Sequence, residues 1–308
     1  MRMEDYPKAI LEFEQRFTTE QACHDYLFQL RWPDGFCCPR CHCRKAWHTR
    51  RGLYRCEHCD FQVSVIAGTI FQSTRKPLRL WFRAIWYITN QKNGVSALGL
   101  QRTLGLSRYE TVWTWLHKLR AAMVRPDRDR LSGIVEVDET YIGGVRSGKR
   151  GRGAAGKALV VIAVEDKGNR LGRIRLRRVV DASAKSLTPA VQEMVEPGSV
   201  VRTDDWNGYL KLPTEGYKRK IIRQEAAVGD NLLPLVNRVA SLLKRWLQGT
   251  HHGAVHPSHL DYYLDEFTFR FNRRTSRSRG KLFYHLVQQA VAVDPITAKD
   301  IRGGPVLS

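Results

Sequence analysis

The segment IVEVDETYIGG, residues 134–144, alternates apolar residues with carboxylates in a pattern that is typical of a β-strand. Successive side chains of a strand point to opposite faces, so Glu136 and Asp138 share one face, together with Ile134. The two valines of the segment and Glu139 point to the other face. Burying an unpaired carboxylate costs free energy, and we therefore expect groups opposite these acids that balance their charge.

The chain as a whole is strongly basic. Its 308 residues include 51 Lys and Arg against 30 Asp and Glu, a formal net charge of +21, which favours a polyanion such as nucleic acid as partner. A hydrophobic content of 43% is enough for a core and excludes wholesale disorder. The N-terminus resembles no signal peptide, and no apolar run approaches the roughly 18 residues of a membrane helix. We expect a cytoplasmic, nucleoid-associated protein without a membrane partner.

Four of the seven cysteines form two CxxC pairs with fourteen residues between the pairs. In a reducing compartment such pairs are read as four thiolate ligands of one tetrahedral zinc ion, not as disulfides. His42 and Asp60 follow the two pairs, where a cysteine knuckle often requires the left-handed backbone that both residue types tolerate. Cys37 and Cys43 leave a shifted set of ligands open. The sequence thus predicts a zinc ribbon with one structural Zn²⁺, bound by Cys38, Cys41, Cys56 and Cys59.

Residues 73–125 show the apolar spacing of helices. Within them, the segment 95–123 reads as a short helix that ends at Gly105, followed by a second helix with Ser107 as predicted N-cap. This arrangement fits a helix-turn-helix, although helical hairpins that bind nothing look the same. In the DNA-binding interpretation, the second helix presents three side chains to a groove: Arg108, Thr111 and Lys118.

From residue 130 onward, strand and helix patterns alternate in a definite order. Three strands, a helix capped near Ser186, two further strands and a long amphipathic helix at 233–248 form the element order of an RNase H-like domain. The predicted fold class is α/β (α+β), with a mixed five-stranded sheet. In that fold the centre of the first strand lies beside the end of the fourth, which places Asp138 next to Asp204. The predicted segments are a ribbon with an N-terminal helix at 1–68, a helix-turn-helix-like region at 69–128, a catalytic domain at 129–290 and a tail at 291–308.

A basic stretch, GVRSGKRGRGAAGK at residues 144–157, separates the first two of these strands. Gly143 to Lys149 matches GxxxxGK, but Arg150 replaces the Ser or Thr that would bind Mg²⁺, and a strand follows in place of a helix. A phosphate-binding P-loop is therefore excluded. The loop either contacts DNA phosphates or is a solvated basic hairpin. The candidate contacts are Arg146, Lys149, Arg150 and Arg152.

Phosphodiester cleavage commonly uses two divalent ions held by carboxylates, and Asp138 and Asp204 are the candidate ligands. Asp205 is the rival of Asp204, but the strand alternation puts Asp204 at the strand end and Asp205 in the turn. The segment 233–248 contains no acid. Its Asn237 can offer a carbonyl oxygen to Mg²⁺, unless it is an ordinary helix residue, and Lys244, seven residues on, shares its face and can contact phosphate.

The motifs together carry a resemblance to a known family. The motifs that carry this resemblance are the CPxC…CxxC ribbon, VDETYIGG, the TD of VVRTDDW, NRVASLLKR and GTHHGAVHPSHLDYYLDEFTFRFNRR. Over nearly its whole length, the chain resembles the zinc-ribbon DDE transposases of small bacterial insertion sequences. The match is to the subgroup with a D, D, N/E/H, K signature. It implies DNA cleavage and strand transfer with two Mg²⁺ or Mn²⁺ ions, on double-stranded element ends and target DNA, by a homo-oligomer. The implied signature residues are Asp138, Asp204, Asn237 and Lys244.

Two further points bear on function. Arg273 and Arg274 begin a basic edge suited to backbone phosphate, and the histidines between 251 and 259 lack the spacing of a metal site. Two alternatives stay open, and the first is favoured by Asn237, which stands where many relatives have an acid. One is a non-catalytic DNA-binding protein derived from a transposase. The other is a structure-specific nuclease on the same fold.

Overall fold

The computed structural model describes residues 4–125, 128–143, 157–168, 170–222, 232–253 and 255–303. The chain forms two compact units. The first comprises Met1–Arg125 with Ser276–Ile301, and the second Pro126–Thr275 with Arg302–Ser308. Over the described residues, no helix combines the length and the apolar character that crossing a membrane requires.

The first unit opens with two helices and the ribbon. Helices α1 (Ile10–Arg16) and α2 (Glu20–Arg31) precede a three-stranded antiparallel sheet of β1 (Ala46–His48), β2 (Tyr54–Cys56) and β3 (Gln62–Val63). The end of α2 and the ribbon share a small aromatic cluster. In it Trp32 contacts Phe28, Phe36 and Tyr54, with ring centroids 5.0–5.5 Å apart. A cluster with so few apolar groups cannot account for the stability of the ribbon, so another interaction must contribute much of it.

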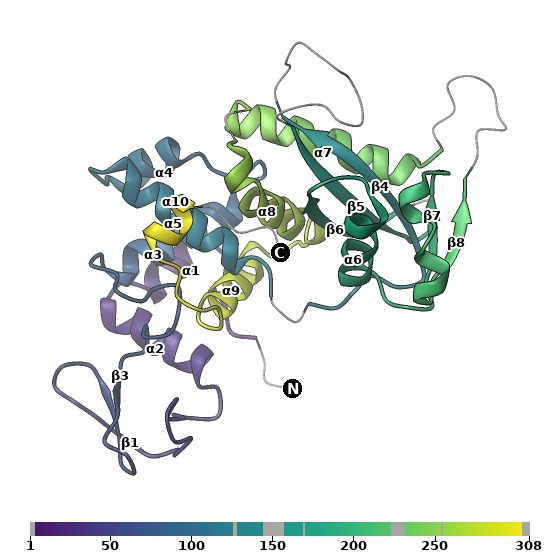
Figure 1. The fold of residues 1–308 in the computed structure, drawn as a ribbon. Coiled ribbons are helices and arrows are strands. Elements are labelled where there is room, and N and C mark those ends of the chain that lie inside the picture. The colour runs from purple at the N-terminus through teal and green to yellow at the C-terminus, as the bar shows by residue number, and fades with distance from the viewer. Residues whose placement is uncertain are drawn as a thin grey trace. The chain divides into compact units, whose positions relative to one another are not determined.

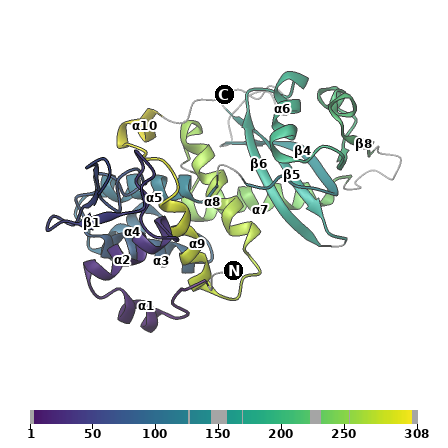
Figure 2. The same ribbon diagram turned by 90° about the horizontal axis from the view of Figure 1, so that it is seen from below.

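The remaining helices of this unit are α3 (Leu78–Asn90), α4 (Ala97–Leu104), α5 (Tyr109–Ala122) and α9 (Arg279–Ala290), with α10 (Ala298–Gly303) at the end. Figure 2 shows α9 among them, and it packs against α2, α3 and α5. The fully buried Phe283 of α9 meets the rings of Phe13, Phe82 and Trp86. This aromatic packing explains why α9 joins the first unit, although the sequence pattern assigned it to the segment 129–290.

Helices α4 and α5 form the predicted hairpin. Gly105 ends α4 with a φ of 63°, the left-handed conformation that glycine adopts most readily. The prediction that Ser107 caps α5 is wrong, because the helix begins at Tyr109 and Arg108 occupies the N-cap without a side-chain hydrogen bond. The carbonyl of Ser107 instead accepts a hydrogen bond from Gln101 Nε2 at 3.2 Å, which fixes the turn.

The second unit contains the mixed five-stranded sheet expected from the sequence. Its strands run in the order β6-β5-β4-β7-β8. Strand β5 is antiparallel to both β4 and β6, whereas β7 is parallel to both β4 and β8. The bounds are β4 (Ile134–Ile142), β5 (Ala158–Asp166), β6 (Leu171–Val179), β7 (Val200–Thr203) and β8 (Lys218–Ile221).

Helices cover both faces of this sheet (Figure 1). Helices α7 (Pro234–His251) and α8 (Leu260–Asn272) pack on one face, with a short 3₁₀ turn η3 (Pro257–His259) between them. Helix α6 (Ala184–Met194) and the 3₁₀ turns η1 (Asn207–Tyr209) and η2 (Leu212–Glu215) cover the other. The predicted cap near Ser186 is wrong. The N-cap is Ser183, and Ser186 lies in the first turn, where its hydroxyl donates to Asp181 at 2.7 Å.

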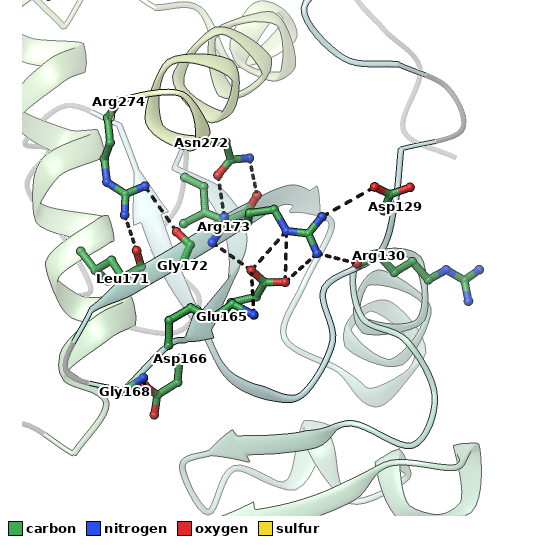
Figure 3. Close-up of polar contacts among 12 residues, drawn as sticks. Asp129, Arg130, Glu165, Asp166, Gly168, Leu171, Gly172, Arg173, Asn272 and Arg274 are labelled. Atoms are coloured by element: carbon green, nitrogen blue, oxygen red, sulfur yellow. Dashed lines mark hydrogen bonds and ion pairs between the residues drawn. The ribbon is translucent and has the colours of Figure 1, made fainter. Parts of the chain in front are cut away.

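In the first half of the outer strand β6, the end of α8 forms hydrogen bonds with the free edge of the strand, as Figure 3 shows. The side chain of Asn272 accepts from the backbone N–H of Ile174 at 2.8 Å and donates to its carbonyl at 3.1 Å. The amide thereby replaces a neighbouring strand at this position and satisfies two polar groups of the sheet edge.

Candidate metal centres and nucleic-acid contacts

The four predicted cysteine ligands meet at one point of the ribbon. Their sulfurs all lie within 4.8 Å of one another, with Cys38 and Cys59 3.7 Å apart and Cys41 and Cys56 3.5 Å apart. A tetrahedron with Zn–S bonds of about 2.3 Å has S···S edges of about 3.8 Å. The separations therefore fit a structural Zn²⁺ bound by four thiolates.

The local backbone explains why these cysteines and not their neighbours converge. His42 and Asp60 have φ values of 59° and 56°, the left-handed turn predicted after each pair. Cys37 and Cys43 point elsewhere, because their sulfurs contact the carbonyls of His42 at 3.9 Å and Lys45 at 3.8 Å. The structure thus selects the two symmetric pairs over a shifted set of ligands.

Glu136 on β4 shows what stands opposite the first buried acid of the strand. Its side chain is 3% exposed, and its Oε2 accepts hydrogen bonds from the backbone N–H groups of Leu235 at 2.9 Å and Val236 at 3.2 Å. Burial raises the pKa of Glu136, while these two hydrogen bonds oppose the rise. The first turn of α7 is therefore the partner of this carboxylate.

The register of the sheet brings Asp138 towards Asp204. The parallel ladder of β4 and β7 pairs Ile134 with Val200 and Glu136 with Arg202. Asp138 and Asp204 each lie two residues beyond the last pair of this ladder, with Asp204 just past the end of β7. Strand alternation also gives Asp204 the face of Arg202, whereas Asp205 is exposed in the following turn. The choice of Asp204 over Asp205 as metal ligand stays a prediction.

A buried tyrosine, Tyr209 of η1, lies near the carboxylates at this end of the sheet. Its hydroxyl donates to Glu139 Oε2 at 2.8 Å. Burial raises its pKa far above the ordinary value, and the carboxylates of Glu139, Asp138 and Asp204 add to that rise. Three acids therefore lie near one phenol. Within the described ranges only the cysteine cluster gathers three or more His, Cys, Asp or Glu ligand atoms within 4.8 Å, so these acids form no ready-made three-carboxylate cage.

Asn237 and Lys244 both project from α7 and are exposed. Asn237 lies in the first helical turn, directly after Val236, whose N–H is bound by Glu136. Desolvation lowers the pKa of Lys244, and the positive charge of Lys157 at the start of β5 lowers it further. Two lysines near each other leave a local excess of positive charge that suits a phosphate.

The three residues of the α5 segment that were expected to contact DNA differ in how exposed they are. Arg108 is exposed at the start of the helix and Thr111 is half-buried. Lys118 donates its ammonium to the carbonyl of Ile70 at 3.1 Å, and burial lowers its pKa. Only Arg108 of the three is thus fully available to a groove. The loop residues Arg146, Lys149, Arg150 and Arg152 lie outside the described residues.

The arginines at the end of α8 make internal contacts, of which Figure 3 shows those of Arg274. Arg274 donates to the carbonyls of Leu171 and Gly172 at the start of β6. Arg273 lies 4.2 Å from the ring centroid of Phe269. Both side chains are engaged in joining α8 to the sheet or in packing on the helix itself, and contact with phosphate remains a prediction for them.

Two contacts near the candidate site could not be read from the sequence. The hydroxyl of Tyr209 donates to Glu139 from a short 3₁₀ turn, and the hydrophobic periodicity of the sequence does not predict this turn. The sequence contains only a weak indication that Glu136 caps α7. Helix α7 begins with a proline after Leu233, has no acid in its first turn and no side-chain cap, and therefore needs an acceptor from elsewhere.

A mixed five-stranded sheet flanked by helices, in a chain that also carries a four-cysteine ribbon, is the arrangement of a zinc-ribbon DDE transposase. Residues 130–272 match the ISXO2-like transposase domain, and residues 18–62 match the transposase zinc-ribbon domain. The chain belongs to the IS1595/ISXO2-like DDE transposases. A protein described as "Uncharacterized protein in transposable element ISH50" from Halobacterium salinarum is 27% identical over 289 residues, covering 86% of this chain and 94% of that protein.

Proposed function

We propose that this protein is an active transposase that binds the ends of its element, cleaves DNA there and joins the ends to target DNA. The observation that supports the proposal is the parallel ladder of β4 and β7, because Asp138 and Asp204 each follow its last pair, Glu136 and Arg202, by two residues. Two paired carboxylates in a chain of formal charge +21 suit a polyanionic substrate that reacts at phosphorus.

The site residues divide the work of phosphodiester cleavage. Asp138 and Asp204 would hold two Mg²⁺ or Mn²⁺ ions, which activate the attacking oxygen and neutralise the leaving oxygen. Asn237 would complete the set with its carbonyl oxygen, and Lys244 would contact the phosphate. Attack of water on phosphorus breaks the P–O3′ bond and leaves a 3′-hydroxyl. That hydroxyl then attacks a phosphodiester of the target, with loss of a second 3′-oxygen.

A strand-transfer assay with DNA carrying the candidate element ends tests this function directly. We expect a joined product that requires a divalent ion and both aspartates. Cleavage without joining would favour a structure-specific nuclease, and binding without any reaction would favour a non-catalytic derivative of a transposase. Cross-linking of the DNA complex should show more than one copy of the chain, because joining two ends requires that they be brought together.

Asn237 offers the most informative single substitution in this site. As a carbonyl ligand it should lose at least about tenfold in cleavage rate when changed to Ala. Asn237→Glu should retain or raise activity, because Glu restores a charged oxygen on the same helix face. Cleavage is measured over a Mg²⁺ titration. Parental rates for Asn237→Ala would mean that Asn237 is only a surface residue of α7.

DNA binding should depend on salt and divide into two kinds of contact. Neutralising the basic residues between 145 and 157 should weaken binding to every sequence alike and reduce its salt dependence. Arg108→Ala should chiefly reduce the preference for element ends, by about 1–3 kcal/mol if the arginine contacts a base. Both variants are compared on element-end and random duplexes. Equal losses on the two duplexes for Arg108→Ala would contradict a reading helix.

A further inference from the structure

The contact between β4 and α7 joins two parts of the proposed metal site. Glu136 lies two residues before Asp138 on the same face of β4, and its Oε2 binds the N–H groups of Leu235 and Val236. The next residue along α7 is Asn237. One buried carboxylate thus connects the strand that carries the first aspartate to the helical turn that carries the third candidate ligand.

Helix α7 depends on this contact because its own sequence supplies no cap. The first N–H groups of a helix have no partner within the helix and usually bind a Ser, Thr, Asp or Asn side chain at the N-cap. Here the N-cap is Leu233, followed by Pro234, and the first turn has no acid. Glu136 binds the N–H groups of the second and third residues of the helix, the ones a local cap would bind. Its negative charge also lies at the positive end of the helix dipole.

Apolar packing alone would not fix the first turn as closely. Leu233, Val236 and Val239 anchor α7 in the core on this face of the sheet. Such contacts are non-directional and tolerate a small rotation of the helix. Two hydrogen bonds to adjacent N–H groups set the rotation of the turn, and with it the direction in which Asn237 leaves the helix. A shift of one ångström is enough to weaken a metal ligand or a catalytic contact.

We propose that Glu136 is a positioning residue that holds Asn237 in place for the divalent ion bound by Asp138 and Asp204. This inference rests on the proposed function, since it requires that the two aspartates bind the ion. Glu136 is buried, and we assign it no direct contact with substrate. Its effect is exerted through the first turn of α7, and it should therefore depend on the side chain at position 237.

Mn²⁺ binding to the full-length protein, measured by calorimetry without DNA, tests the proposal independently of activity. Glu136→Ala should weaken Mn²⁺ binding about tenfold or more, as loss of a supporting partner commonly does. Glu136→Gln, which keeps an acceptor oxygen but not the charge, should lose less. Glu136→Asp keeps the charge but is one methylene too short to reach α7, and it should lose more than Glu136→Gln. These two variants carry the test if Glu136→Ala does not fold.

Glu165→Gln is the matched control. Glu165 is 1% exposed on the adjacent strand β5 and also accepts from a backbone N–H, that of Arg173 at 3.1 Å, together with the Arg173 guanidinium (Figure 3). Its pairing with Val135 puts it on the face of the sheet opposite to Glu136. Glu165→Gln should lower thermal stability and leave the Mn²⁺ affinity unchanged. An equal loss of Mn²⁺ affinity in this control would overturn the proposal.

A double substitution separates positioning through Asn237 from other effects. On the Asn237→Ala background, Glu136→Gln should cause no further loss of Mn²⁺ affinity, because the group it positions is gone. An additive loss would overturn the proposal, as would parental Mn²⁺ affinity in folded Glu136→Gln and Glu136→Asp. Failure of the proposed function has a different outcome. In that case the parent protein either binds no Mn²⁺ or keeps its affinity after Asp138→Asn.

Discussion

Asp138→Asn is expected to abolish DNA cleavage while leaving DNA binding intact or tighter. The substitution removes one of the two charges that would hold the catalytic ions, which are worth several kcal/mol of transition-state stabilisation, or roughly a thousandfold in rate. It also removes a negative charge that repels phosphate, so affinity for DNA should not fall. Cleavage of end-labelled DNA and binding in the absence of divalent ions measure the two effects separately.

The aspartates that follow β7 supply the control. Asp204→Asn should be as inactive as Asp138→Asn, because both residues are proposed ligands of the same ions and each lies two residues beyond the last pair of the β4–β7 ladder. Asp205→Asn should keep substantial activity, since its side chain is exposed in the turn. If Asp205→Asn were the inactive variant and Asp204→Asn active, the register predicted beyond the end of β7 would be off by one residue.

The alternation of β4 made most of the catalytic domain predictable. A period of two separates the face of Glu136 and Asp138 from that of Val135 and Val137, and the structure buries the valines under α6 as that period requires. The element order then fixed the mixed sheet. The cysteine spacing was equally informative, because two CxxC pairs leave little choice of ligands once the left-handed turns at His42 and Asp60 form.

Contacts between distant segments escaped prediction for a physical reason. The bonds from Leu235 and Val236 to Glu136 span about a hundred residues, and no local pattern encodes them. The cap of α5 was misplaced because a serine near a helix start satisfies the propensity rule wherever the first turn begins. Helix α9 packs in the first unit through the aromatic contacts of Phe283. The periodicity of α9 alone cannot specify which unit it packs against.

Cys56→Ser is expected to release the zinc ion and unfold the ribbon. Purified parent protein should contain about one equivalent of Zn²⁺, and the variant close to none. In zinc-finger peptides the metal supplies about 10–16 kcal/mol, far more than the small aromatic cluster around Trp32 can provide. Elemental analysis measures the metal. Trypsin cleavage at the exposed Arg50 and Arg51 should become much faster as the ribbon opens.

Cys43→Ser is the matched control for this experiment. It removes a thiol of the same segment whose sulfur contacts the Lys45 carbonyl and lies outside the cluster, so zinc content and protease resistance should match the parent. Zinc loss in Cys43→Ser, or full zinc retention in Cys56→Ser, would contradict the ligand set. Because the sheet of the second unit has its own core, its resistance to trypsin should survive in Cys56→Ser, which confines the effect of zinc to the first unit.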